Sequence, residues 1–308
     1  MSTEDAELGP LNDGCDHSGL VDPAGDGNVL VEHLARRFPR ADAETWALRA
    51  ANGELFVSGE PAGADRIVRA GQRVLWRRPP WREPLVPLGF AILWRDPEVL
   101  VVAKPRGLPT LPGGGLFDLH TVMRQVEKRI PGARPVHRLG RHTSGIVLCG
   151  RTRRARGVLS AGFRDGTTQK EYVALVEGHV PEGEHTIDVP LGPVPHPKLG
   201  TVTAHSPEGK PAFTTFERIE SRGAESLVRV RIATGRPHQI RIHCAWLGHP
   251  LVGDPLYGIG GLPKSDALPS DGGYALHARR VVAPHPAGRK LITVECMPPP
   301  DLRSTRGT

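Results

Sequence analysis

The chain of 308 residues has little cysteine, few aromatic side chains and no long apolar run. Its four cysteines, Cys15, Cys149, Cys244 and Cys296, are far apart and form no CxxC pair, so a disulfide-rich secreted scaffold is excluded and reduced thiols are expected. No apolar run reaches membrane-spanning length, and residues 1–7 are acidic without the apolar segment of a signal peptide. The sequence therefore predicts a cytoplasmic protein that makes no membrane contact.

Metal-binding patterns are also missing. His243, Cys244 and His249 lie close together, but their spacing matches no familiar metal site. We therefore expect structural roles for them and no bound metal.

Positive charge is absent from the first 35 residues and concentrated later, although the formal net charge is +7. Residues 134–170 contain nine Lys or Arg against one acid, Asp165. Such a field suits a polyphosphate partner, because each neutralised phosphate releases counterions. A solvated basic helix face would give the same pattern.

The most informative stretch of the chain is the polar segment that leads into an apolar run at 146–149. It reads His137-Arg138-Leu139, then three residues, then Thr143-Ser144-Gly145. The pattern predicts an irregular loop that feeds a buried strand, with Gly145 at the change of period. It closely resembles the signature of the RluA-type RNA pseudouridine synthases, in which the residue after the Leu is the catalytic aspartate. In this chain that position is Gly140.

Four further segments resemble the motifs of that family and occur in the same order. They are residues 101–109 (VVAKPRGLP), 169–178 (QKEYVALVEG), 234–243 (TGRPHQIRIH) and 248–258 (GHPLVGDPLYG). The resemblance covers about residues 88–300. It implies an RNA partner, no cofactor and no membrane, and it leaves the oligomeric state open.

Composition and periodicity divide the chain into five parts. We expect a disordered acidic head at 1–26, a small module at 27–78, a proline-rich linker at 79–87, a pseudouridine synthase-like catalytic domain at 88–300 and a tail at 301–308. The small module is predicted to hold two helices, the second capped by Asp42, and then a hairpin. This order resembles the S4-type RNA-binding module.

Strands outnumber helices in the expected catalytic domain, and many are joined by short turns. The fold class predicted from this pattern is α+β, with a largely antiparallel mixed sheet and flanking helices. The family resemblance implies the same architecture.

The resemblance also implies roles for single residues. Arg138 would occupy the space left by a flipped base, Tyr172 would stack on the target uracil, and Arg241 would pair with the family aspartate. The remaining RNA-binding candidates are basic residues in or beside the motifs: Arg141, Arg151, Arg153, Arg154, Lys170, Arg236 and His238.

Gly140 interrupts this scheme, because a glycine offers no group that attacks, accepts a proton or balances Arg241. Three alternatives remain open. A carboxylate from elsewhere replaces the aspartate, with Asp254 the first candidate and Asp118 a weaker one. Alternatively His142 acts as the base, or Arg241 holds water or an RNA phosphate. The first two give a pseudouridine synthase with an altered catalytic position, and the third gives a catalytically inactive RNA-binding or RNA-remodelling protein.

Overall fold

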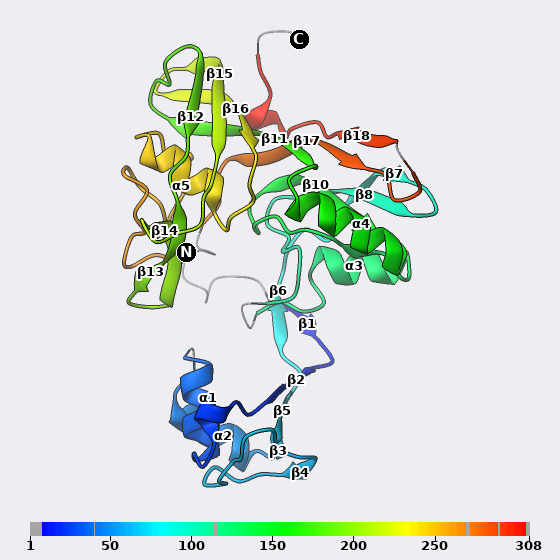
Figure 1. Cartoon of the computed structure of the whole chain (residues 1–308), viewed down its shortest axis with the longest axis vertical. Coiled ribbons are helices and arrows are strands. Elements are labelled where there is room, and N and C mark those ends of the chain that lie inside the picture. Colours follow the sequence, from blue (N-terminus) through cyan, green and yellow to red (C-terminus); the bar gives the residue numbers. More distant parts are fainter. Residues whose placement is uncertain (1–7, 40, 114–115, 269–271, 289, 306–308) are drawn as a thin grey trace. The chain divides into compact units, whose positions relative to one another are not determined.

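The computed structural model describes residues 8–39, 41–113, 116–268, 272–288 and 290–305. The chain divides into two compact units, a smaller one of residues 8–83 and a larger one that begins at Pro84 (Figure 1). Each unit has its own core.

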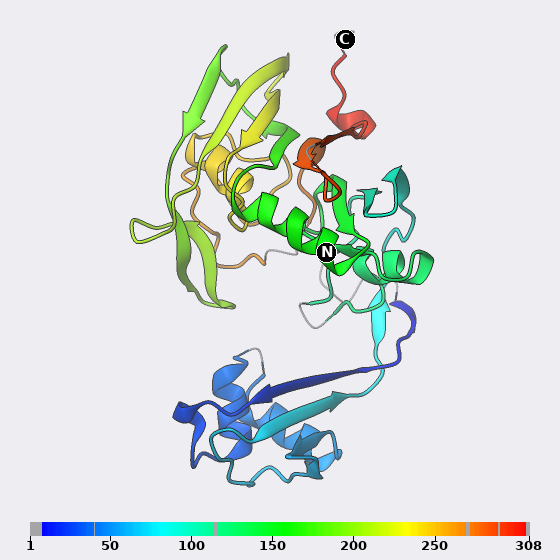
Figure 2. The ribbon, with the colours of Figure 1, turned by 45° about the vertical axis from the view of Figure 1, so that its right-hand side comes forward.

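The smaller unit contains two helices and a four-stranded antiparallel sheet. Helix α1 is Leu30–Arg37 and helix α2 is Ala43–Ala51. The strand order is β2 (Cys15–Leu20), β5 (Arg73–Arg78), β3 (Leu55–Val57) and β4 (Glu60–Pro61), and Figure 2 shows β2 and β5 side by side. The predicted helices are confirmed, and the Asp42 carboxylate caps α2 by accepting from the Thr45 amide.

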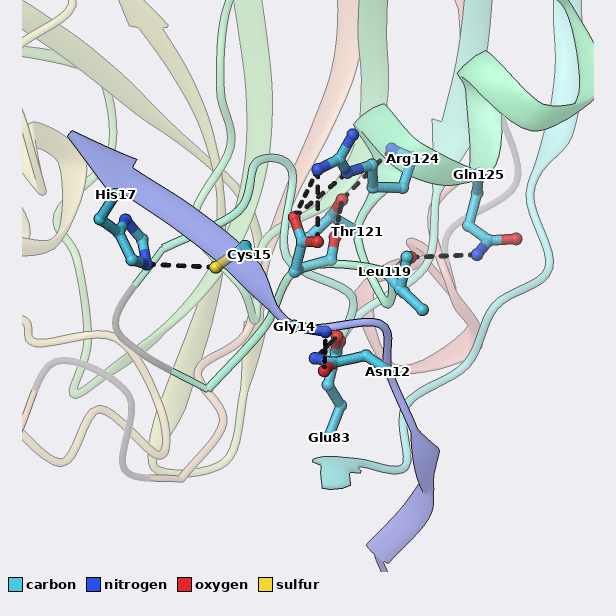
Figure 3. A network of polar contacts seen from close by, with 10 residues as sticks. Asn12, Gly14, Cys15, His17, Glu83, Leu119, Thr121, Arg124 and Gln125 are labelled. Atoms are coloured by element: carbon cyan, nitrogen blue, oxygen red, sulfur yellow. Dashed lines mark hydrogen bonds and ion pairs between the residues drawn. The ribbon is translucent and has the colours of Figure 1, made fainter. Parts of the chain in front are cut away.

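The expected disorder of residues 1–26 is wrong for residues 8–25. Strand β1 (Leu8–Leu11) pairs with β6 (Arg82–Pro84) inside the predicted linker, and a 3-10 turn, η1, follows β2 at Pro23–Gly25. Buried Asn12 donates to Glu83 Oε1 at 2.9 Å and accepts from the Gly14 amide (Figure 3). Composition missed this order because the partners lie far along the chain. The rest of the predicted head, residues 1–7, lies outside the described residues.

The larger unit is built on a ten-stranded sheet. Its main path runs β12-β15-β16-β11-β17-β10-β8-β7, with β18 paired to β17 and β9 paired to β10. The strands are β7 (Ala91–Arg95), β8 (Val99–Lys104), β9 (Arg134–Pro135), β10 (Ser144–Gly150), β11 (Gln169–Glu177), β12 (Glu184–Ile187), β15 (Thr214–Arg222), β16 (Glu225–Ile232), β17 (Leu276–Pro284) and β18 (Leu291–Glu295). All its pairings are antiparallel except β10 with β17, so the predicted α+β class with a largely antiparallel mixed sheet is confirmed.

Two further strands, β13 (Leu191–His196) and β14 (Gly200–His205), form a separate hairpin.

Both faces of the sheet are covered. Helices α3 (Val122–Arg129) and α5 (Gln239–Trp246) share one core with Val147 and Cys149 of β10. The alternate residues of β10, Ile146 and Leu148, pack with Leu159 of α4 (Arg153–Arg164). A second 3-10 turn, η2 (Pro300–Leu302), packs on residues of β11 and β16 that point away from α5. Strand alternation thus places α4 on the opposite sheet face from α3 and α5.

The parallel pairing of β10 with β17 is the feature that positions the site. Ser144 lies beside His277 and Gly145 beside Ala278, so the segments that precede both strands meet at the same edge of the sheet. Gly145 has φ +106°, and a Cβ there would lie 2.2 Å from the Ala278 carbonyl oxygen. Only glycine fits this contact, which accounts for the last residue of the Thr-Ser-Gly motif.

Candidate active site

The loop of residues 136–143 is held by internal hydrogen bonds. The His137 ring stacks on Phe163 with centroids 4.3 Å apart, and its Nε2 accepts from the Leu148 amide at 2.9 Å. Burial, followed by the charge of Lys170, lowers the pKa of His137 to about 3, so the ring is neutral. Thr110 Oγ1 both donates to the Leu139 carbonyl and accepts from its amide. The loop is therefore positioned by the scaffold rather than by a ligand.

Lys104 holds the same loop near Arg141. Its buried Nζ donates to the carbonyls of Pro105, Leu108 and Arg141 at 3.0, 2.6 and 2.9 Å. Burial and the charge of Arg141 lower its pKa to about 7, but three carbonyl acceptors match the three N–H groups of an ammonium. We assign the charged form at neutral pH.

Gly140 is exposed, but other atoms already occupy the space into which a side chain at residue 140 would point. A Cβ at residue 140 would lie 2.3 Å from the hydroxyl of Tyr274 and 3.4 Å from Thr143 Oγ1. Thr143 donates to that hydroxyl at 3.3 Å. Tyr274 lies just before β17, so the parallel pairing of β10 and β17 brings it to this loop.

Arg241 lies on α5 and is paired with Asp254. Its Nε donates to Oδ2 and its Nη2 to Oδ1, both at 2.7 Å, and the two side chains are only 3% and 1% exposed. Burial lowers the pKa of Arg241, but the hydrogen bonds and charge of Asp254 more than offset this, and the net shift is upward. The pair is buried and closed to solvent.

Asp254 is the carboxylate first expected to compensate for Gly140, and it does reach Arg241. It also accepts from the amides of Leu256 and Tyr257, at 2.9 and 3.1 Å. It accepts four hydrogen bonds, three of them on Oδ1, and its side chain is 1% exposed, so it is closed to a substrate in this structure. Its geometry is that of a structural counter-ion.

Asp118, the weaker candidate, is committed elsewhere. It lies before α3 and accepts from the Nε and Nη2 of Arg124 at 3.1 and 2.9 Å (Figure 3). The N-cap of α3 is Thr121, whose hydroxyl accepts from the Arg124 amide. The suggestion that Asp118 pairs with Arg241 is therefore wrong.

Two tyrosine rings lie against the Arg241 guanidinium. Its Cζ is 4.3 Å from the ring centroid of Tyr274 and 5.0 Å from that of Tyr257. The Tyr257 hydroxyl donates to the Thr203 carbonyl at 2.6 Å and lies 2.8 Å from His238 Nδ1. Tyr257 thus ties the site to β14, whereas Tyr274 spans the space between Arg241 and Gly140.

Tyr172, the predicted uracil platform, lies on β11 between β16 and β17. It is 9% exposed, it belongs to the same core as Leu139 and Tyr274, and burial raises its pKa to about 12. The ring offers little surface to a base before RNA binds, whereas the Tyr274 ring packs on the Arg241 guanidinium. The stacking role of Tyr172 stays a prediction.

His142, the alternative base, lies edge-on to Tyr274 with ring centroids 5.9 Å apart. It is half-buried. Tyr274 therefore lies at the position where the expected carboxylate is missing, and His142 packs against its ring.

The predicted RNA-binding residues divide into two groups. Arg138 is exposed on the loop. Burial and the charge of Arg241 lower the pKa of His238 to about 3, and the charge of Arg138 also lowers it. Arg141 donates to the Gly107 carbonyl and Arg236 to the Pro211 carbonyl. These four residues surround the loop and the start of α5.

The other four lie on or beside α4 and β11. Arg153 and Arg154 are exposed on α4, Arg151 donates to the Asp96 carbonyl, and buried Lys170 donates to the Thr234 carbonyl near Arg236. Because α4 packs on the opposite sheet face from α5, Arg153 and Arg154 come from a different face than Arg236 and His238. Contact of these residues with RNA stays a prediction.

Other site types are not found in the part of the chain that the structure describes. No group of three or more His, Cys, Asp or Glu residues there is arranged to hold a metal ion, and no helix there is long and apolar enough to cross a membrane. His243 bonds Thr214 and the Val189 carbonyl, and Cys244 is buried.

Sequence reasoning missed Tyr274, Thr143 and Lys104. Thr143 and Lys104 lie within motifs that were noticed, but their partners are backbone carbonyls and a hydroxyl distant in sequence. The available signal for Tyr274 was its place directly before Ala275-Leu276-His277-Ala278, in a chain with only three tyrosines.

Known proteins similar to this chain include RNA pseudouridine synthases, as the motifs of the site suggest. Residues 98–246 match the family model of RNA pseudouridylate synthases. An RNA pseudouridine synthase of Synechocystis, itself described as uncharacterized, is 39% identical over 89% of this chain and 95% of its own length. RNA pseudouridine synthase 5 of Arabidopsis thaliana is 37% identical over 96% of this chain and 95% of its own length.

A solved structure, human RNA Pseudouridylate Synthase Domain Containing 1, shares 28% identity with a TM-score of 0.56, covering 72% of this chain and 89% of that one. The matched lengths extend through the motifs that build the site around Gly140 and Arg241. The chain belongs to the RNA pseudouridine synthase family, a family of isomerases that act on RNA.

Proposed function

We propose that this chain isomerises uridine to pseudouridine in a structured ribosomal or transfer RNA, with an altered catalytic position at Gly140. Among its relatives are a ribosomal large subunit pseudouridine synthase D and a tRNA pseudouridine(32) synthase, which support these two RNA classes. A cytoplasmic location and RNA binding by the S4-like smaller unit are parts of the same proposal. The reaction needs no cofactor, and the oligomeric state is left open.

The chemistry sets what the site must do. The bond between ribose and uracil lies inside the stacked helix, so the nucleotide must be flipped out. As that bond breaks, the uracil leaves with the bonding electrons and carries negative charge, which nearby donors and cations stabilise. The uracil then turns and rejoins the sugar through carbon 5.

The single observation that carries the proposal is the cluster at the edge of β10 and β17. Exposed Arg138 lies on a loop fixed by Lys104 and Thr110, above a buried guanidinium, Arg241, that is held in one orientation by Asp254. In this proposal Arg138 fills the space of the flipped base, and Arg241 supplies fixed positive charge beneath the site.

The test is pseudouridine mapping of RNA from cells with and without the gene, and from cells carrying Arg138→Ala. We expect at least one uridine to lose its modification in both the deletion and the variant. Arg95→Ala, which changes an exposed arginine on edge strand β7, is the matched control and is expected to keep the modification. Identical maps with and without the gene would refute the isomerase.

A second candidate function rests on a specific observation. Gly140 has no side chain, and the Asp254 carboxylate that pairs with Arg241 is buried and already accepts four hydrogen bonds. An RNA-binding protein without isomerase activity would have this arrangement. Salt-dependent binding of a uridine-containing RNA, with no pseudouridine formed by the purified chain, would favour this candidate.

A further inference from the structure

The inference concerns Tyr274, a residue outside the family motifs and unused in the roles assigned above. Three contacts define it. Its hydroxyl lies 2.3 Å from the position of a Cβ at residue 140, it accepts from Thr143 at 3.3 Å, and its ring centroid is 4.3 Å from the Arg241 Cζ. The side chain therefore fills the space between the exposed loop and the buried cation.

The first step is steric. A contact of 2.3 Å is far shorter than any that a real Cβ makes, so residue 140 and the Tyr274 hydroxyl exclude each other. The ring carbon that bears the hydroxyl, Cζ, is 3.7 Å from the same position, which is ordinary van der Waals contact. Removing one oxygen atom is thus enough to make room for a Cβ atom at residue 140.

The second step is electrostatic. Arg241 already has its full anionic partner in Asp254, at 2.7 Å and with both side chains buried. A second carboxylate at residue 140 would lack a dedicated counter-ion, whereas a neutral phenol needs none. The ring packs over the guanidinium as a cation–π contact, so Arg241 fixes the direction of the hydroxyl.

The third step is the direction of the proton. Because Thr143 donates to the Tyr274 oxygen, the phenolic hydrogen is left for an acceptor other than Thr143. Gly140 above it is exposed and adds no side-chain atom in the way. Tyr274 is 3% exposed and Gly140 lies directly beside its hydroxyl, so the hydroxyl reaches a flipped nucleotide only when RNA binding moves the loop of residues 136–143 aside.

We propose that Tyr274 is a catalytic residue of this chain, whose hydroxyl takes the place of the side chain missing at residue 140 and donates a hydrogen bond to the flipped uridine. No bond forms between tyrosine and substrate. The hydroxyl stabilises the negative charge that the uracil gains as the bond between nitrogen 1 and the ribose breaks. When carbon 5 bonds to the sugar, that electron pair forms the new bond, carbon 5 then loses its proton, and nitrogen 1 ends with one. The proposal rests on the proposed isomerase function.

The closing experiment compares turnover of uridine-containing RNA by the purified full chain and four variants. Tyr274→Phe keeps the ring over Arg241 and removes only the hydroxyl. We expect kcat to fall by about 10²-fold or more, as for the loss of one charge-stabilising donor, while KM stays unchanged. Ser221→Ala is the control, because it removes an exposed hydroxyl on β15 that bonds His179, and it should keep the wild-type kcat.

The remaining variants test the shared space. Gly140→Ala alone should lower the melting temperature, since the new methyl group meets the hydroxyl. Gly140→Ala combined with Tyr274→Phe should regain the melting temperature of Tyr274→Phe. Equal destabilisation in both backgrounds would overturn the steric step, whether or not the chain is active.

The two proposals fail differently. Wild-type turnover that Tyr274→Phe leaves intact would overturn the role of Tyr274 and keep the isomerase. No turnover by the wild type on uridine RNA would overturn both, and the melting temperatures would still report whether residues 140 and 274 share one space.

Discussion

Two glycines near the start of β10 lie equally close to their neighbours, yet the neighbours differ in kind. A Cβ at Gly145 would meet the Ala278 backbone oxygen at 2.2 Å, and a Cβ at Gly140 would meet the Tyr274 side-chain oxygen at 2.3 Å. The first contact belongs to the sheet and cannot relax without separating two strands. The second can be relieved by deleting one atom. Glycine is thus required by the scaffold at one position and by a replaceable side chain at the other.

The largest expected effect on stability comes from the buried ion pair of Arg241 and Asp254, on which the Tyr274 ring packs. Asp254→Asn leaves the Arg241 charge buried without a partner, which should lower the free energy of unfolding by about 3–5 kcal/mol in urea titrations. Asp118→Asn is the control, because its partner Arg124 is 46% exposed, and the expected loss is below about 1 kcal/mol. Equal losses in the two variants would mean that Arg241 finds another counter-charge.

Gly145→Ala tests the backbone contact. Positive φ and a clash with a carbonyl oxygen act together, so we expect a loss of about 3 kcal/mol or more of unfolding free energy. Tyr274→Phe should not rescue this variant, since Tyr274 takes no part in the contact. Rescue would show that the two glycines are not independent.

Gly140→Ala tests the side-chain contact. The added methyl should cost about 1–3 kcal/mol, the usual range for overpacking. In a Tyr274→Phe background the cost should shrink to a few tenths of a kcal/mol, because the nearest remaining atom of Tyr274 is 3.7 Å away. The four unfolding curves form a double-mutant cycle, and additive losses would contradict a shared space.

These two contacts also show how far the sequence could lead. The strand at Ile146–Cys149, the helix capped by Asp42 and the α+β class were predictable, because each follows from local periodicity and capping. That Gly145 marks a change of period was also visible. The Ala278 oxygen that requires it was not, since the β10–β17 register joins residues far apart in the chain.

The site was predictable in its motifs and not in its partners. The sequence indicated that Gly140 leaves Arg241 without the family carboxylate, and it placed Asp254 first among the substitutes. It could not show that Asp254 also accepts hydrogen bonds from two backbone amides. Nor could it show that the Tyr274 hydroxyl occupies the place of a side chain at residue 140. Both facts depend on the parallel register and on the turn after Leu251, which long-range pairing decides.

The smallest expected effect comes from Tyr274→Phe alone. The variant loses one hydrogen bond of 3.3 Å from Thr143 and keeps the ring, so unfolding free energy should fall by about 0.5–1.5 kcal/mol. Thr143→Val, which removes the donor and keeps the shape, should cost a similar amount, and the double variant little more than either alone. For Tyr274→Phe we expect a small loss of stability and a large loss of turnover, which is the signature of a residue that acts on the substrate. For Gly145→Ala we expect a large loss of stability, which is the signature of a residue that maintains the fold.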